Sequence, residues 1–340
     1  MTTMKDVAKE AGVSLGTVSA VINGSASVKA ENVKKVTQAC EKLGFVPNLV
    51  ARTLRTGSST GIGLLIPDIT NPYYPELARG VEDAAFQVGY NVFLCNNDRN
   101  EAKERDYVNY LLSKNVDGIL MTKPQLSIDE LKMVRKRCEL VILDPGNTPF
   151  QEFDTVVADN ITGAREAVAS LCRHGHKRIA YVSGSMDSES ANERFNGYLQ
   201  ILEENNMIAD KQIIKHAGYS WSSGYEAGRE LLRESNRPTA IFAANDIIAF
   251  GIIKALADNG LQVPRDMSVV GFDDIIMASY STPSLSSVRM PKYEMGQKSV
   301  EILVKRRNER NEARKSSYNE SVLARFETEY IERESVSSCP

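Results

Sequence analysis

The residues best suited to bind a small molecule are carboxylates and amides that come directly after short apolar runs. They are Asp68, Asn96, Asn97, Asp98, Asp144, Asp159, Asn245, Asp246, Asp273 and Asp274. Open α/β sheets bind ligands at the carboxyl ends of their strands, where these side chains would lie if the runs are parallel strands. Asp159 and Asp246 have an alternative role, because Asp at such a position also caps the helix that follows.

Motifs for catalysis or metal binding have little support in the sequence. Residues 12–16 match G-x-S-x-G, but no strand precedes them, as a nucleophile elbow requires. No phosphate-binding G-x-x-x-x-G-K-[ST] loop occurs, and no G-x-G-x-x-G follows a strand. The histidines are His174, His176 and His216, and the first two are interpreted as a loop before a strand rather than a metal site. We therefore expect no enzyme activity, no metal and no cofactor.

A cationic run lies near the end of the chain, at residues 305–315. Such a run can attract nucleic acid. Its interleaved Asn and Glu residues favour a solvated helix end and loop instead.

Apolar runs alternate with amphipathic stretches from residue 61 onwards. The runs occupy residues 61–67, 90–95, 117–121, 139–143, 154–158, 177–183, 212–216, 239–244 and 267–272. Short, continuously apolar strands separated by longer helices are typical of parallel sheets with helices on both faces. The number of runs predicts an α/β core of two lobes, each a doubly wound parallel sheet.

The first 45 residues predict three short helices. Thr3 and Asp6 have the spacing of a capping box, Gly12 would end the first helix, and Ser14 would cap the second. The apolar face of a third helix would consist of Val33, Val36, Ala39, Cys40 and Leu43. Two short helices joined by a three-residue turn with glycine are typical of a helix-turn-helix motif, although small helical bundles share the pattern.

Charge is unevenly distributed along the chain. The formal net charge is −3, but residues 1–60 carry +4 and the remainder carries −7. A small cationic head on an acidic body indicates an anionic partner for the head alone. The five cysteines form no C-x-x-C motif, and no stretch is apolar enough to span a membrane. We therefore expect free thiols and a cytoplasmic protein.

Segments spread over almost the whole chain carry one common pattern. In the head they are residues 5–8, 11–14, 17–19 and 23–24, and residues 44–54 follow as a hinge. In the core they are residues 67–74, 175–180, 194–198, 237–241, 263–266 and 271–274. In order and spacing, from residue 4 to about 334, they resemble the lactose-repressor/galactose-repressor (LacI/GalR) family of bacterial transcription regulators.

The resemblance implies a three-helix helix-turn-helix head, a hinge helix and a two-lobed core like that of periplasmic binding proteins. The head would cover residues 1–47, and the hinge helix with its linker residues 48–60. The N-terminal lobe would comprise residues 61–160 and 290–320, and the C-terminal lobe residues 161–289 and 321–335.

The resemblance also implies which head residues bind DNA. Ser14, Thr17 and Asn23 would hold phosphates, as hydroxyls and amides near a helix start can do. The residues that would reach base edges are Leu15, Gly16 and Ala20, with Ser19 in the same set. Many members have a polar or cationic residue at position 20, so Ala20 departs from the pattern and offers only apolar contact.

The hinge of such regulators folds on the operator. Here its DNA-binding residues would be Asn48, Ala51, Arg52, Leu54 and Arg55. Leu54, paired across a dimer, would insert into the minor groove, and the two arginines would flank it at phosphates. The alternative is a plain connecting helix with Leu54 packed on the core.

The core of the family binds a small effector between its lobes. The effector-binding residues implied here are Tyr73, Tyr74, Asp144, Ser190, Arg194, Tyr219, Trp221, Asn245 and Asp273. Aromatic faces with carboxylate, amide and guanidinium groups suit a neutral polyhydroxylated ligand. No Lys or Arg cluster that would mark a phosphate is evident, so we expect a sugar or sugar derivative.

The expected function is that of a transcriptional regulator that represses a catabolic operon. It would bind a palindromic operator in double-stranded DNA as a homodimer, without a leucine-heptad tail for a tetramer. The alternatives are a cytoplasmic sugar-binding protein and an α/β enzyme without a role on DNA.

Overall fold

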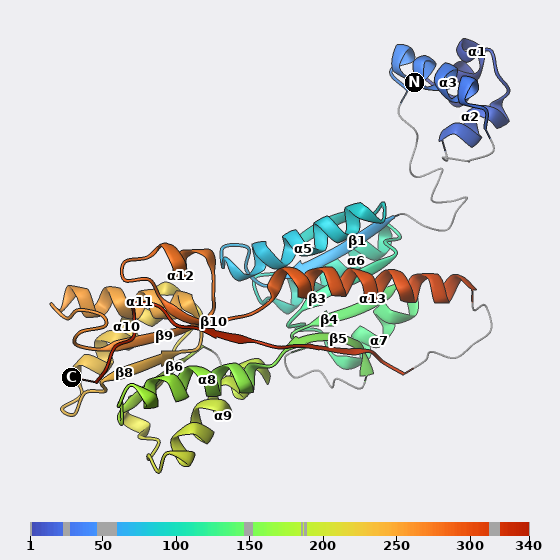
Figure 1. Cartoon of the computed structure of the whole chain (residues 1–340). Coiled ribbons are helices and arrows are strands. Elements are labelled where there is room, and N and C mark those ends of the chain that lie inside the picture. The colour runs from blue at the N-terminus through green and yellow to red at the C-terminus, as the bar shows by residue number, and fades with distance from the viewer. Residues whose placement is uncertain are drawn as a thin grey trace. The chain divides into compact units, whose positions relative to one another are not determined.

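The computed structural model describes residues 2–22, 28–45, 60–145, 152–184, 186, 189–312 and 320–339. The chain divides into two compact units, a head within residues 1–59 and a core of residues 60–340 (Figure 1). In the described part of the chain, no helix is both long and apolar enough to cross a membrane.

The head consists of α1 (Met4–Ala11), α2 (Leu15–Ile22) and α3 (Ala30–Leu43). Thr3 and Asp6 form the predicted capping box, and Gly12 ends α1 in the left-handed conformation at φ 65°. The core of the head is small, and its buried residues are Val7, Val18, Val36 and Ala39. The prediction of three helices is confirmed, but Val33 of the expected apolar face is exposed.

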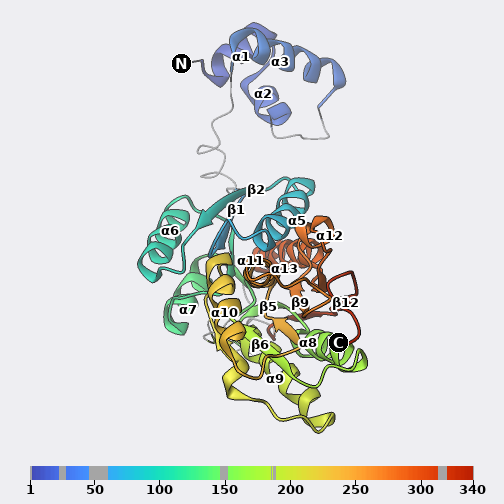
Figure 2. The ribbon, with the colours of Figure 1, turned by 90° about the vertical axis from the view of Figure 1, so that its left-hand side faces the viewer.

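The first lobe of the core is built on a sheet of parallel strands in the order β11-β5-β4-β3-β1-β2. The strands are β1 (Gly61–Ile66), β2 (Asn91–Asn96), β3 (Gly118–Thr122), β4 (Glu139–Leu143), β5 (Asp154–Ala158) and β11 (Leu323–Phe326). Helices α5 (Tyr73–Gln87) and α13 (Lys292–Glu312) cover one face, and α6 (Glu101–Ser113) and α7 (Ile128–Arg137) cover the other (Figure 2). Neighbouring residues of one strand therefore pack into different hydrophobic clusters on the two faces of the sheet, as Leu64 and Leu65 of β1 do.

The second lobe has a sheet in the order β12-β10-β9-β8-β6-β7, in which only β12 runs antiparallel among the described strands. The strands are β6 (Ile179–Ser183), β7 (Ile214–His216), β8 (Ala240–Ala243), β9 (Ser268–Asp273), β10 (Ser286–Arg289) and β12 (Glu329–Ile331). The helices are α8 (Asn160–Arg173), α9 (Glu189–Glu204), α10 (Trp221–Arg233), α11 (Asp246–Asp258) and α12 (Ile276–Tyr280). The predicted α/β class with two parallel-dominated sheets is confirmed.

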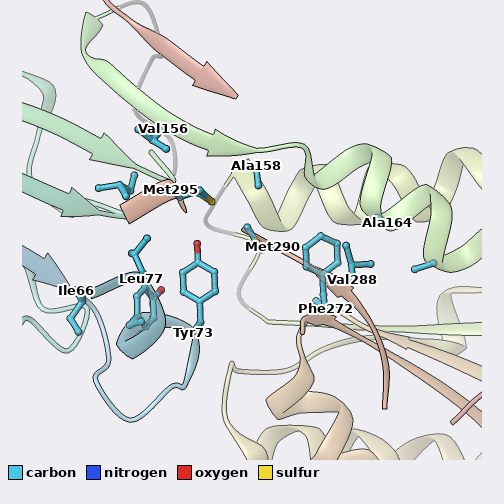
Figure 3. Packing of buried hydrophobic residues seen from close by; sticks show 14 of the residues in the cluster. Ile66, Tyr73, Leu77, Val156, Ala158, Ala164, Phe272, Val288, Met290 and Met295 are labelled. Atoms are coloured by element: carbon cyan, nitrogen blue, oxygen red, sulfur yellow. The ribbon is translucent and has the colours of Figure 1, made fainter. Parts of the chain in front are cut away.

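The chain passes between the two sheets after β5, after β10 and after β11. Because β11 pairs with β5, the assignment of residues 321–335 as a whole to the second lobe was wrong for this strand. A continuous apolar cluster extends from the first sheet to the second, with Tyr73, Met290 and Met295 between them (Figure 3).

The interpretation of the cationic run as a solvated helix end was wrong for Arg306, Arg307 and Arg310 of α13, whereas residues 313–315 of the run lie outside the described residues. Arg306 forms two 2.8 Å bonds with the buried Asp154 carboxylate. Arg307 pairs with Asp117 at 2.8 Å, and Arg310 pairs with Glu139 at 2.8 Å. The three acids stand at the amino-terminal ends of β3, β4 and β5, which a parallel sheet brings to one edge.

Candidate functional site

The start of α2 is exposed and rich in groups that hydrogen-bond anions. Ser14 caps the helix, since its Oγ accepts from the Thr17 N–H at 3.1 Å and lies 2.9 Å from Thr17 Oγ1. Val18 is buried in the core of the head, whereas Leu15 at the start of the helix is 43% exposed. A Cβ added at Gly16 would meet only Ser14 Oγ, at 3.7 Å, so another surface can approach this turn closely. A helix start of this kind suits a phosphate.

The remaining residues predicted to bind DNA are less exposed or lie elsewhere. Thr17, Ser19 and Ala20 are half-buried on α2. The other six, Asn23, Asn48, Ala51, Arg52, Leu54 and Arg55, lie outside the described residues.

In the core, Arg194 of α9 is the centre of a polar cluster at the carboxyl ends of the second sheet. Its Nη1 donates to the Ala244 carbonyl at 2.6 Å and lies 3.4 Å from Asp273 Oδ1. Its Nε donates to Asn160 Oδ1 at 2.9 Å. The Arg194 Cζ lies 3.8 Å from the centroid of the Phe272 ring. These contacts fix the position of the buried guanidinium, and a group with a fixed position can orient a ligand.

Asp273 is held in place by a lysine that no sequence pattern singles out. Lys292 is 1% exposed, and its Nζ donates to the carbonyls of Asp273 at 2.5 Å and Asp274 at 3.2 Å. The same Nζ pairs with Glu76 of α5 at 3.2 Å. Burial raises the pKa of the Asp273 carboxyl, while Arg194 and Lys292 oppose this shift.

Asp144 connects the two lobes. It follows β4 of the first lobe and accepts a bond from Ser190 Oγ of the second lobe at 3.1 Å. Lys123, another residue missed from the sequence, pairs with Asp144 at 3.1 Å. Burial disfavours the charged form of Lys123, yet the Asp144 carboxylate raises its pKa above the ordinary value. Lys123 and Asp144 both have positive φ angles, of 48° and 52°, which the sequence does not reveal.

The predicted aromatic residues differ in their surroundings. Tyr73 and Tyr74 are buried edge to face, with centroids 5.0 Å apart, and burial raises the pKa of Tyr74 to about 12. Tyr219 of the second lobe lies against two cations of the first, Arg99 at 4.7 Å and Lys123 at 5.3 Å from its centroid. Trp221 instead stacks on Tyr225 of its own helix and is 45% exposed, so it is the least enclosed of the set.

Among the polar residues that follow strands, Asp159, Asn245 and Asp246 have structural roles. Asp159 caps α8 by accepting from the Thr162 N–H, as one interpretation of the sequence held. Asn245 caps α11 through Oδ1, which accepts from the Ile248 N–H at 2.8 Å. The same interpretation was wrong for Asp246, whose carboxylate instead accepts from the Ile275 N–H and Ser287 Oγ and holds the loop after β9.

A cavity of about 10 Å³ lies beside Asp144, Ser190, Glu189 and Glu193. This is room for about one water molecule. This cavity is too small for a sugar, so a sugar bound at this place would have to displace the surrounding side chains or the lobes.

Metal binding has no evident place among the described residues, since no three His, Cys, Asp or Glu side chains there could hold an ion. His176 is buried, and its ring nitrogens contact Thr239 Oγ1, Ser268 Oγ and the Ser337 carbonyl at 3.0–3.1 Å. Burial lowers its pKa. These contacts tie the end of the chain to the second sheet.

Both compact units contain a segment that matches a model of a known protein family. Residues 3–48 match the model of bacterial regulatory proteins of the lacI family, and residues 168–336 match that of a periplasmic binding protein-like domain. Catabolite control protein A of Priestia megaterium is 38% identical over 307 residues, which is 90% of this chain and 92% of the relative.

Two solved structures are similar over nearly the whole chain. The transcriptional regulator CelR in complex with cellobiose has a TM-score of 0.74 and 30% identity, and covers 99% of this chain and 100% of its own. The lac repressor dimer bound to operator and the anti-inducer ONPF has a TM-score of 0.83 and 28% identity, with 98% of each chain covered.

Proposed function

Because the chain belongs to the LacI family of bacterial regulatory proteins, we propose that it is a repressor of a catabolic operon, switched by a sugar. Its relatives are transcriptional regulators, so the chain is a DNA-binding regulator and not an enzyme. It would work in the cytoplasm, where a bacterial operator lies.

The observation that carries the proposal is the polar cluster between the lobes. Arg194 and Asp273 belong to the second lobe, and Asp144, which bonds Ser190 across the junction, belongs to the first. A ligand that replaces some of these contacts changes the relative stability of the lobe arrangements. Such differential binding is the only way in which a ligand can shift an equilibrium.

A sugar is the favoured effector class on chemical grounds. The buried edge-to-face pair Tyr73 and Tyr74 supplies apolar faces, and the charged groups beside it suit hydroxyls. CelR, which is similar over the whole chain, was solved with cellobiose. The cations Arg99 and Lys123 around Tyr219 leave a sugar with an acidic group as a second candidate.

The test of the proposal has two steps. In the first, operator sequences are selected from random double-stranded DNA with the purified full chain, and we expect a palindrome. In the second, neutral and acidic sugars are screened by the shift in thermal unfolding that they cause. A chain that selects no sequence would refute the proposed repressor, and a chain that no sugar stabilises would refute the proposed effector class.

Operator binding should depend steeply on salt. Log affinity is expected to fall with log salt by about 0.9 for each phosphate neutralised. Substitution Arg52→Ala should weaken binding to all DNA sequences. It should also reduce the magnitude of that slope by about 0.9, the contribution of one phosphate. The measurement is fluorescence anisotropy with labelled operator over a salt series, with Arg265→Ala in the core as the control. An operator affinity that does not change with salt would contradict the prediction.

A homodimer is supported by exposed apolar side chains on both lobes of the core. In the first lobe they are Phe86 and Val88 at the end of α5, and Phe93 and Leu94 on the edge strand β2. In the second lobe they are Ile276, Met277 and Tyr280 of α12. Phe86 is 77% and Tyr280 78% exposed, and large exposed apolar groups are frequent at protein interfaces.

Substitution of these exposed apolar residues by glutamate should separate the proposed dimer into monomers. We expect the double substitution Phe86→Glu and Phe93→Glu to yield a monomer, because the charges would be buried without partners. Sedimentation equilibrium measures the mass. Ile208→Glu is the matched control, since Ile208 is 91% exposed and away from these residues in the sequence. A dimer that persists in the double variant, or a monomeric wild type, would contradict the assignment.

A further inference from the structure

A second cavity lies in the second lobe, away from the cluster around Arg194. Its volume is about 280 Å³, and its lining residues are Arg229, Leu232, Arg233, Arg237, Asn259 and Leu261. The cavity is formed where α10 and α11 end and where the chain approaches β8. Ala244, whose carbonyl accepts from Arg194 in the cluster between the lobes, follows β8, whereas Arg237 precedes it. The two sites are therefore at opposite ends of this strand.

The lining is cationic, because three of the six residues are arginines and none is acidic. Arg229 pairs only at the surface, with Glu226 at 3.3 Å. Arg237 donates from Nε to the Leu232 carbonyl at 3.0 Å, which orients its guanidinium. Within the described chain, Arg233 has neither a hydrogen bond nor an ion pair to another residue. Two guanidiniums thus retain N–H donors that the protein itself does not use.

Helix capping accounts for only one of these charges, because Arg237 alone donates to a carbonyl in the last turn of α10. At the end of α10, the Leu231 carbonyl accepts from the Glu234 N–H, and at the end of α11 the Leu256 and Ala257 carbonyls accept from Asn259 and Gly260 N–H groups. A cation near a helix end is favourable, but one would be enough at each end. The convergence of three arginines on a cavity therefore indicates an external anion.

We propose that this cavity binds a small molecule that carries at least two oxyanion groups, such as linked phosphates. A guanidinium binds phosphate or carboxylate through two parallel hydrogen bonds, and several guanidiniums around one space select a multiply charged ligand. Leu232 and Leu261 provide an apolar wall for the rest of the molecule. The site is independent of the proposed function, because it shares no residue with the cluster between the lobes.

The test uses pyrophosphate and the full chain in isothermal titration calorimetry at low salt. We expect one saturable site per chain, with a dissociation constant of about 1 mM or lower. Substitution Arg233→Gln should weaken binding about tenfold, since it removes a charged hydrogen-bond pair. It should leave folding unchanged, because Arg233 makes no bond within the described chain. Charge reversal by Arg233→Glu should abolish binding.

Two controls keep the outcome specific. Arg265→Gln removes an exposed arginine of the same lobe and should change the affinity for pyrophosphate less than about twofold. Arg194→Met removes a guanidinium of the cluster between the lobes and should also leave pyrophosphate binding in place. The proposal is overturned if the wild type shows no saturable binding, if Arg265→Gln weakens it as much as Arg233→Gln does, or if Arg194→Met abolishes it.

Discussion

Substitution Arg194→Met is expected to abolish the response to the effector sugar while operator binding persists. The guanidinium is buried among Asn160, Ala244 and Asp273, so its loss leaves ligand hydroxyls without partners in a dry site. Such a loss costs about 2–5 kcal/mol, or about 30- to 4,000-fold in affinity. Methionine keeps the apolar contact with Phe272. The measurement is titration of the sugar found in the thermal screen.

The control for this prediction is Arg165→Met on the neighbouring helix α8. Arg165 is partly exposed and pairs with Glu204, so its removal should leave sugar affinity unchanged. Operator binding is measured for the Arg194→Met variant as well, because binding shows that this variant is folded. If that chain responds to the sugar at ordinary concentrations, the effector does not bind at Arg194.

Substitution Arg306→Met is expected to destabilise the core strongly. Arg306 and Asp154 are both buried and form a pair with two bonds of 2.8 Å. Asp154 Oδ1 also accepts from the Val322 N–H at 2.7 Å, so the pair joins α13, β5 and the chain entering β11. Removal of one partner from a buried pair costs about 3–5 kcal/mol, because the other charge is left uncompensated. Urea unfolding measures the change.

Two further variants test whether the unpaired buried charge causes the loss of stability. The double substitution Arg306→Met and Asp154→Leu should recover most of the lost free energy of unfolding, since no charge then remains unpaired. Arg79→Ala breaks an exposed pair with Asp83, which solvent screens, and should change the free energy of unfolding far less than Arg306→Met does. If Arg306→Met costs no more than Arg79→Ala, the pair does not hold the three elements together.

Local patterns predicted most of the fold. Helix caps such as Thr3 and Ser14 act within a few residues, and each apolar run predicted in the core contains a strand. Strands β10, β11 and β12 were missed because they are short and lack a continuous apolar run. The arginines of α13 were misjudged because a sequence shows their spacing but not the acids at the facing edge of the sheet.

The residues of the candidate site were less predictable than its location. Arg194, Asp273, Asp144 and Ser190 do come together, as expected from the resemblance. Lys123 and Lys292 could not be found, since lysine is usually a surface residue and its burial here depends on contacts between distant elements. The backbone of Thr60, where the core begins, donates to Asp117, and Asp117 pairs with Arg307. This ties the entry of the chain into the core to α13, a link invisible in the sequence.

The effector should act on DNA binding by changing how the two lobes lie relative to each other. The cavity beside Asp144 and Ser190 is about 10 Å³, which is too small for a sugar, so we expect a sugar bound there to shift the lobe arrangement. The proposed hinge, which includes Leu54, precedes the core directly in sequence. Insertion of several glycines after Thr56 should preserve both binding activities and remove their coupling, because a flexible linker does not transmit a displacement.

The most direct measurement is the operator dissociation constant of the full chain with and without saturating sugar, by fluorescence anisotropy at fixed salt. The two constants should differ by about 5- to 150-fold, the range of ordinary allosteric coupling. The glycine-extended chain should show less than about twofold difference under the same conditions. Equal operator affinity with and without bound sugar in the wild type would contradict a regulator that is switched through the junction between its lobes.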